Sequence, residues 1–144
     1  MPTVIETSVG LDRTILALLA RGYEEDTAAT QKEGMDEDVR IVLHLPPLVA
    51  PVQLAVLPLS KKLDENAVKL YTDLNRYFRC EYDVTGSIGK RYRRQDEIGT
   101  PLCLTFDFES AADNAVTVRD RDTMQQQRVN ISELRSYIEN AINR

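Results

Sequence analysis

Residues 102–109 alternate strictly between apolar and polar side chains. A period of two is typical of a β-strand that has one apolar and one polar face. The apolar face of this predicted strand consists of Leu102, Leu104, Phe106 and Phe108. Its polar face consists of Cys103, Thr105, Asp107 and Glu109. The chain is therefore expected to contain a sheet with one face against a hydrophobic core.

Strand and helix patterns alternate along the rest of the chain after Pro51. Short apolar runs predict strands, and apolar residues repeated three and four positions apart predict helices. Gly99 and Pro101 are suited to end a helix. The predicted elements are strand 52–57, helix 64–78, strand 80–84, helix 88–98, strand 102–109, strand 115–121, a strand around 128–129 and helix 132–142. This order predicts an α/β fold, with a mixed sheet of about five strands and three covering helices.

The N-terminal third differs from the rest in charge. Residues 1–45 carry nine acidic and four basic residues, whereas residues 46–144 carry fourteen of each. A short helix is predicted over 11–22, with Gly22 at its end. The segment 24–38 has seven acidic residues and no apolar period, so we interpret it as a mobile connector. The chain is accordingly divided into residues 1–23, 24–38 and 39–144.

Composition excludes several classes of protein. The length of 144 residues corresponds to one domain, possibly with an appendage, and no apolar run approaches the roughly 20 residues that cross a bilayer. Two cysteines and one histidine, without metal-ligand spacing, predict no metal site. We expect a cytoplasmic protein without a membrane partner.

Four basic residues lie within the predicted helix 88–98, at Lys90, Arg91, Arg93 and Arg94. Helical spacing places at least two of them on the surface, which suits contacts with nucleic-acid phosphates. The alternative is an ordinary solvated helix face, on which Asp96 and Glu97 pair with Arg93.

The polar faces of two strands suggest a second site. Asp107 lies with Thr105 and Glu109 on the polar face of one strand, and Arg119 and Arg121 lie with Thr117 on the polar side of the next. A carboxylate accepts a hydrogen bond from the cytosine amino group and a guanidinium donates to ring acceptors, so such a face could read unpaired bases. The alternative is that these side chains pair with one another across the sheet.

Three segments resemble a known family. Residues 4–13, VIETSVGLDR, are similar to motif 3 of class II aminoacyl-tRNA synthetases, in the form found in dimeric glycyl-tRNA synthetases. Residues 86–101, GSIGKRYRRQDEIGTP, and 116–124, VTVRDRDTM, resemble the C-terminal anticodon-binding domain of the same enzymes. The resemblance implies that residues 1–23 are a remnant of the catalytic domain and that residues 39–144 are the anticodon-binding domain.

The resemblance also implies roles for individual residues and partners. Arg13 would contact the ATP triphosphate, and Glu6 and Ser8 would help to bind glycine. The full-length enzyme would be a homodimer that uses ATP with magnesium and binds glycine tRNA. For the anticodon contacts we predict Arg93, Arg94, Asp96 and Glu97 from the helix, and Asp107, Arg119 and Arg121 from the strands.

Motifs 1 and 2 of the family have no counterpart in this sequence. We therefore expect the chain to be a C-terminal fragment of a glycine–tRNA ligase that is inactive by itself and binds no cofactor. Two alternatives are compatible with part of the pattern. One is a stand-alone accessory module that uses the synthetase-like fold for protein contacts, and the other is a small flavodoxin-like hydrolase. The sequence has no nucleophile, general base or phosphate loop that the hydrolase alternative would need.

Overall fold

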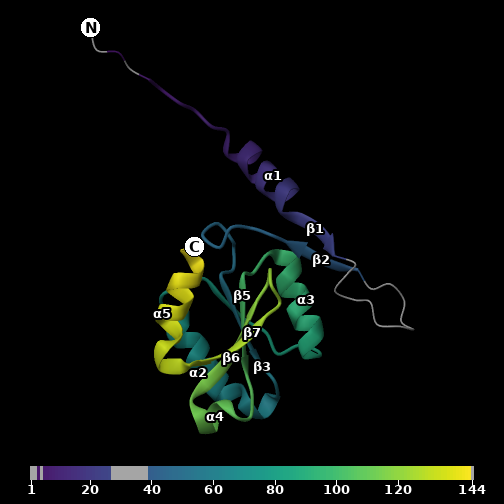
Figure 1. The fold of residues 1–144 in the computed structure, drawn as a ribbon, viewed down its shortest axis with the longest axis vertical. Helices are drawn as coiled ribbons and strands as arrows, with labels where there is room; N and C mark the ends of the chain where they lie inside the picture. The colour runs from purple at the N-terminus through teal and green to yellow at the C-terminus, as the bar shows by residue number, and fades with distance from the viewer. Residues whose placement is uncertain (1–2, 4, 27–38, 144) are drawn as a thin grey trace.

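The computed structural model describes residue 3 and residues 5–26 and 39–143 (Figure 1). The chain begins with α1 (Leu11–Gly22), β1 (Tyr23–Asp26) and β2 (Arg40–Leu43). The main domain follows, as β3 (Leu54–Pro58), a 3₁₀ helix at Lys61–Leu63, α2 (Asp64–Leu74), β4 (Cys80–Tyr82), α3 (Ile88–Ile98), β5 (Leu102–Phe106), α4 (Ser110–Asp113), β6 (Ala115–Asp120), β7 (Gln126–Asn130) and α5 (Ile131–Ile142).

The main sheet has five strands in the order β4-β3-β5-β6-β7. β3 is parallel to both of its neighbours, β4 and β5, whereas β6 is antiparallel to β5 and to β7. The register places Thr105 opposite Thr117, and Thr117 opposite Arg128. The predicted mixed sheet with covering helices is confirmed.

Helices cover both faces of this sheet (Figure 1). α2 and α5 pack on one face, and the main core between them and the strands includes Leu54, Leu104, Val118 and Ile138. α3 lies on the other face, where Ile88 and Tyr92 pack on a smaller cluster from β3 and β5. Leu102, Leu104 and Phe106 belong to the main core, as the alternation predicts. The strand ends at Phe106, however, and Phe108 lies beyond it with 60% of its surface exposed.

Local sequence signals explain where the helices begin and end. Asn130 precedes α5, and its side chain accepts a hydrogen bond from the amide of Ser132, which satisfies an amide that has no partner within the helix. Ser87 caps α3 in the same way. α3 ends at Gly99, which has φ +83° and thus the left-handed conformation that glycine adopts without strain.

A two-stranded antiparallel hairpin, made by β1 and β2, joins α1 to the main domain. The interpretation of residues 24–38 as a mobile connector is wrong for residues 24–26, because Glu24 to Asp26 pair with Arg40 to Val42. The rest of that predicted connector, residues 27–38, lies outside the described residues. α1 extends away from the sheet in Figure 1, and Leu11, Ile15 and Leu16 are exposed on it. Among the described helices, none has the length and apolar character that a membrane crossing requires.

Candidate RNA-binding edge

The carboxyl ends of the three parallel strands meet at one edge of the sheet. β3 and β5 are in register to their last residues, Pro58 and Phe106, and β4 ends beside them at Tyr82. The chain leaves β3 for α2 on one face and leaves β4 for α3 on the other. Open α/β sheets bind ligands in the crevice outside the carboxyl ends, where neighbouring connections pass to opposite faces. We call this region the carboxyl edge.

Arg94 and Asp83 form an ion pair at the carboxyl edge. Arg94 lies on α3, and its Nε donates to Oδ2 of Asp83 at 3.1 Å, while its Nη2 donates to the carbonyl of Thr85 at 2.6 Å. Burial raises the pKa of the Asp83 carboxyl, but the hydrogen bonds from Arg94 and Thr85 outweigh burial and hold that pKa below its usual value. The Arg94 side chain is 44% exposed, so it is available to an anionic ligand.

A second cluster joins β5, β7 and α4 at the same edge. Arg128 donates from Nη2 to Oδ1 of Asp107 at 3.1 Å and from Nε to Oδ2 of Asp113 at 2.9 Å. Its Nη1 donates to Asp107 and to the Thr117 hydroxyl, the latter at 3.2 Å. The hydrogen bonds from Arg128 and Ser110 lower the pKa of Asp107. The side chains of Arg128 and Asp107 are 31% and 21% exposed, so a fixed guanidinium and an ionised carboxylate lie side by side at the surface.

Three of the predicted anticodon residues do not lie on an exposed face. Asp96, Arg119 and Arg121 are only 1%, 6% and 3% exposed. Arg119 donates from Nη1 and Nη2 to the two oxygens of Asp96, at 2.9 and 3.0 Å. The expectation that these groups project outward is wrong. The pairing alternative describes Arg119 better, although its partner lies on α3 and not on the neighbouring strand.

The physical reason is that other elements cover these strand positions. Arg119 lies on the face covered by α3, with its guanidinium over the ring of Tyr92, 4.8 Å from the centroid. The Tyr92 hydroxyl lies 2.6 Å from the Thr105 hydroxyl, and burial raises the pKa of Tyr92. Arg121 follows β6 and is buried beside the hairpin, where it donates to the main-chain carbonyls of Leu43 in β2 and of Gly99 at the end of α3.

The remaining helix residues divide between surface and interior. Arg94 and Glu97 are exposed and Arg93 is half-buried. Arg91 is buried, and its Nη1 donates to the carbonyls of Pro58 at 2.7 Å and of Asp83 at 3.2 Å. One base of the cluster therefore fixes α3 against the ends of β3 and β4, and the others are at or near the surface.

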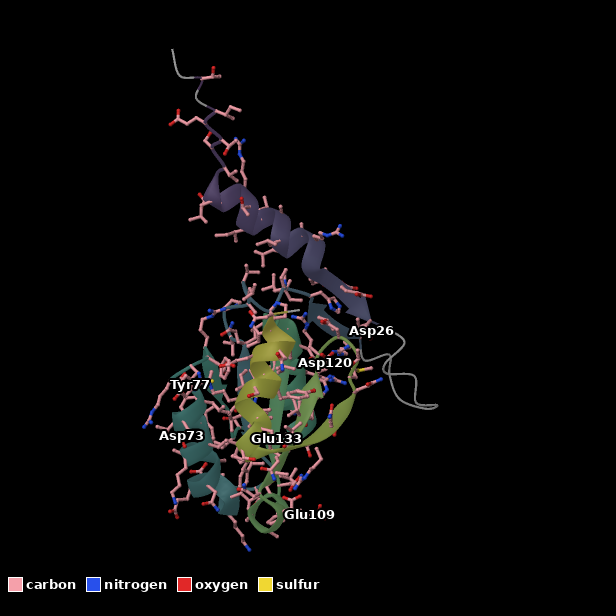
Figure 2. The ribbon with its side chains drawn as sticks, turned by 60° about the vertical axis from the view of Figure 1, so that its left-hand side comes forward. Asp26, Asp73, Tyr77, Glu109, Asp120 and Glu133 are labelled. Atoms are coloured by element: carbon pink, nitrogen blue, oxygen red, sulfur yellow. The ribbon has the colours of Figure 1, made fainter. Side chains whose placement is uncertain are left out.

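The predicted substrate residues lie elsewhere. Glu6 and Ser8 belong to the extended segment before α1, and Arg13 lies in α1; all three are exposed. Figure 2 shows that the hairpin end marked by Asp26 and the α4 end marked by Glu109 lie at opposite ends of the main domain. Because α1 extends from the hairpin end, the structure does not bring these three residues to the carboxyl edge.

Sequence reasoning missed Arg128 and Arg40. Arg128 belongs to a strand predicted only around 128–129, and its face depends on the pairing with β6 that sequence does not show. Arg40 stands inside the apolar run 39–45. A single charged residue within an otherwise apolar run is a signal that could have identified it, because a charge buried there needs a partner.

The described residues offer little to a metal or a nucleophilic reaction. Within them, no group of three or more His, Cys, Asp or Glu side chains is placed to hold a metal ion. Burial raises the pKa of both cysteine thiols, Cys80 and Cys103, to about 12. Thiols with such pKa values stay protonated at neutral pH and are poor nucleophiles.

Known proteins are similar to this chain in sequence. Residues 53–141 match the family described as the anticodon binding domain. The chain is 60% identical over 139 residues to a glycine–tRNA ligase from Lachnoclostridium phytofermentans, and 59% identical over 140 residues to one from Ruminiclostridium cellulolyticum. These matches cover 96% and 97% of this chain but 29% of each relative. The chain thus spans less than a third of the length of these curated relatives.

Solved structures of aminoacyl-tRNA synthetases contain a similar fold. A prolyl-tRNA synthetase from Cryptosporidium parvum, complexed with L-proline and AMP, has a TM-score of 0.65 and 25% identity, over 70% of this chain and 22% of that one. The RNA binding domain of threonyl-tRNA synthetase from Cryptosporidium parvum Iowa II has a TM-score of 0.63 and 28% identity, over 68% of this chain and 25% of that one. The ligase interpretation therefore holds over the accessory-module alternative. The chain belongs to the anticodon-binding domain family, in the form found in glycine–tRNA ligases.

Proposed function

We propose that the carboxyl edge binds the anticodon loop of glycine tRNA. The observation that carries the proposal is the presence of two guanidinium–carboxylate clusters at this one edge, Arg94 with Asp83 and Arg128 with Asp107 and Asp113. Unpaired bases are recognised by stacking on guanidinium planes and by hydrogen bonds to their edges. Both kinds of group are at least partly exposed here: the guanidinium groups lie on α3 and β7, and Asp83 and Asp107 lie just beyond the ends of β4 and β5.

The second cluster suits a cytosine. Glycine anticodons end in two cytosines, whose amino groups donate and whose ring atoms accept. Among the described residues, Oδ2 of Asp107 accepts a hydrogen bond from Arg128 alone, which leaves that oxygen one further lone pair for an amino group. The guanidinium of Arg128 is held at its edges by two carboxylates, so we infer that a base would meet its planar face.

The first cluster suits the phosphate backbone. Nη1 of Arg94 has no hydrogen-bond partner among the described residues, while Nε and Nη2 are held by Asp83 and Thr85. A guanidinium that is held at one side and open at the other is suited to donate to a phosphate oxygen. We infer that Arg93 and Glu97, on the same helix, flank this contact.

We further propose that this domain acts within a homodimeric, cytoplasmic glycine–tRNA ligase that joins glycine to its tRNA at the expense of ATP. Glu6, Ser8 and Arg13 would then serve glycine and ATP with magnesium. Their side-chain types suit an ammonium and a triphosphate. All three are exposed on an extended segment and one helix, so these residues alone form no enclosed nucleotide site, and we expect the isolated chain not to activate glycine.

Fluorescence anisotropy with a labelled anticodon stem-loop of glycine tRNA tests the proposal. Replacing either anticodon cytosine with uridine removes one amino donor, and we expect replacement of the cytosine that Asp107 recognises to weaken binding by about tenfold. Equal affinity for the original stem-loop and for the stem-loops with uridine would exclude recognition of the bases by the carboxylates. Absence of any binding by the original stem-loop would exclude the proposed function itself.

A further inference from the structure

The hairpin of β1 and β2 contacts α3 through a buried arginine, Arg40. Arg40 of β2 is 7% exposed, and its Nε donates to Oδ2 of Asp96 at 2.8 Å. Its Nη2 donates to the carbonyl of Arg121 at 2.8 Å, and its Nη1 lies 3.5 Å from the Asp26 carboxylate on β1. The same Asp96 carboxylate accepts hydrogen bonds from both terminal nitrogens of Arg119. One carboxylate on α3 therefore joins the hairpin to the main sheet.

The end of α3 is fixed to the same hairpin. Nη1 of Arg121 donates to the carbonyls of Leu43, Leu45 and Gly99, at 3.1, 3.1 and 2.8 Å. A Cβ atom at Gly99 would lie only 2.8 Å from the carbonyl oxygen of Leu43. The backbone of the hairpin thus approaches the helix end more closely than any residue but glycine permits.

His44 adds a third attachment. Its Nε2 lies 2.9 Å from the carboxylate of Glu24 on β1, and its Nδ1 lies 2.6 Å from the carboxylate of Asp122 in the turn after β6. Both strands of the hairpin are therefore tied to the end of the sheet opposite the carboxyl edge, as the positions of Asp26 and Glu109 illustrate (Figure 2).

α3 connects this attachment to the proposed RNA contacts. Asp96 is buried against the hairpin, whereas Arg94, two residues earlier, is exposed at the carboxyl edge. An α-helix rises about 1.5 Å per residue and moves as a rigid unit over so short a distance. A displacement of Asp96 must therefore displace Arg93 and Arg94.

We infer that the hairpin positions α3 for RNA binding, and that Arg40 is a positioning residue that acts through Asp96. This inference rests on the proposed function. Coupling between two sites is reciprocal, so bound RNA must also stabilise the hairpin. The hairpin follows α1, the helix that carries Arg13, without a break in the chain.

The test compares stem-loop affinity of the full 144-residue chain with that of Arg40→Met and Arg40→Lys. We expect Arg40→Met to weaken binding by about fivefold, and Arg40→Lys, which keeps the charge beside Asp96, to restore part of the affinity. The control is Ile138→Ala or Ile138→Val, whichever matches the melting temperature of Arg40→Met. Ile138 is buried on the other face of the sheet, and its replacement should leave affinity unchanged.

Hydrogen exchange supplies an independent measurement. Bound stem-loop should slow the exchange of the β2 amides in the wild-type chain and should do so less in Arg40→Met. Wild-type affinity in Arg40→Met, equal weakening by the Ile138 control, or unchanged β2 exchange on binding would each overturn the inference while leaving RNA binding intact. A wild-type chain that does not bind the stem-loop would overturn the proposed function, and the inference with it.

Discussion

Arg128 of β7 reaches across β6 to the carboxylate of Asp107, which follows β5. The guanidinium passes the Thr117 hydroxyl of β6 on the way and donates to it at 3.2 Å. Two strands that are not neighbours are thereby joined at the surface. The contact holds a cation and an anion in fixed positions at the edge where an open α/β sheet binds its ligand.

Arg128→Met should weaken binding of the glycine anticodon stem-loop by about 1–3 kcal/mol, because it removes both the stacking plane and the group that orients Asp107. Its effect on the free energy of unfolding should be small, about 0–1 kcal/mol, since the ion pairs are partly solvated. Anisotropy and urea denaturation measure the two quantities.

Arg135→Met is the matched control for that variant. Arg135 also donates to a carboxylate, Glu139, and lies over the ring of Tyr77, but it belongs to α5 on the other face of the sheet. It should leave RNA affinity unchanged at constant salt. Similar weakening by both variants would mean that net charge, not the carboxyl edge, determines binding.

Arg119→Met should destabilise the fold by about 3–5 kcal/mol, because it leaves the buried Asp96 carboxylate without its bidentate partner. An exposed Arg119, as the sequence predicted, would cost no more than about 0.5 kcal/mol. Urea denaturation of Arg119→Met beside Arg135→Met distinguishes a buried Arg119 from an exposed one. A cost equal to that of the exposed control would contradict the buried pair.

The sequence predicted the fold well because its signals are local. The alternation over 102–106 and the glycine that ends α3 both depend on neighbours in the chain, and both proved correct. The strand at Glu24 to Asp26 was missed because its acidic composition gives no strand signal. It forms through pairing with Arg40 to Val42, across residues 27–38.

The site was predicted less well for a related reason. Basic and acidic residues surround α3, so helical spacing alone does not reveal that Asp96 faces inward while Arg94 faces solvent. That choice depends on Arg40, which is 56 residues earlier in the chain. Asp107 is half-buried, and its partner is Arg128 and not a residue of the adjacent strand.

Acid should reveal the Asp107–Arg128 contact. The hydrogen bonds from Arg128 hold the pKa of Asp107 below its usual value. A carboxyl with a lowered folded-state pKa stabilises the fold above its usual pKa of about 4, and this contribution is lost as pH falls through the lowered pKa. The urea midpoint of Arg128→Met should therefore fall less than that of the wild type below about pH 4.

Arg135→Met again controls for the loss of one positive charge. Its midpoint should follow the wild-type dependence on pH more closely than that of Arg128→Met. Parallel curves for the wild type and Arg128→Met would show that the contact contributes nothing to acid sensitivity.

Two glycines of α3 and its cap provide a test of the hairpin attachment within one helix. Gly99 has φ +83°, and a Cβ there would lie 2.8 Å from the Leu43 carbonyl oxygen, whereas a Cβ at Gly89 would meet nothing within 4 Å. Gly99→Ala should therefore destabilise the fold by more than about 1 kcal/mol, through backbone strain and displacement of β2. Gly89→Ala should be neutral or stabilising by up to about 1 kcal/mol, because alanine favours the helix. Thermal denaturation of both variants measures the contrast, and equal melting temperatures would contradict the close approach of the hairpin to α3.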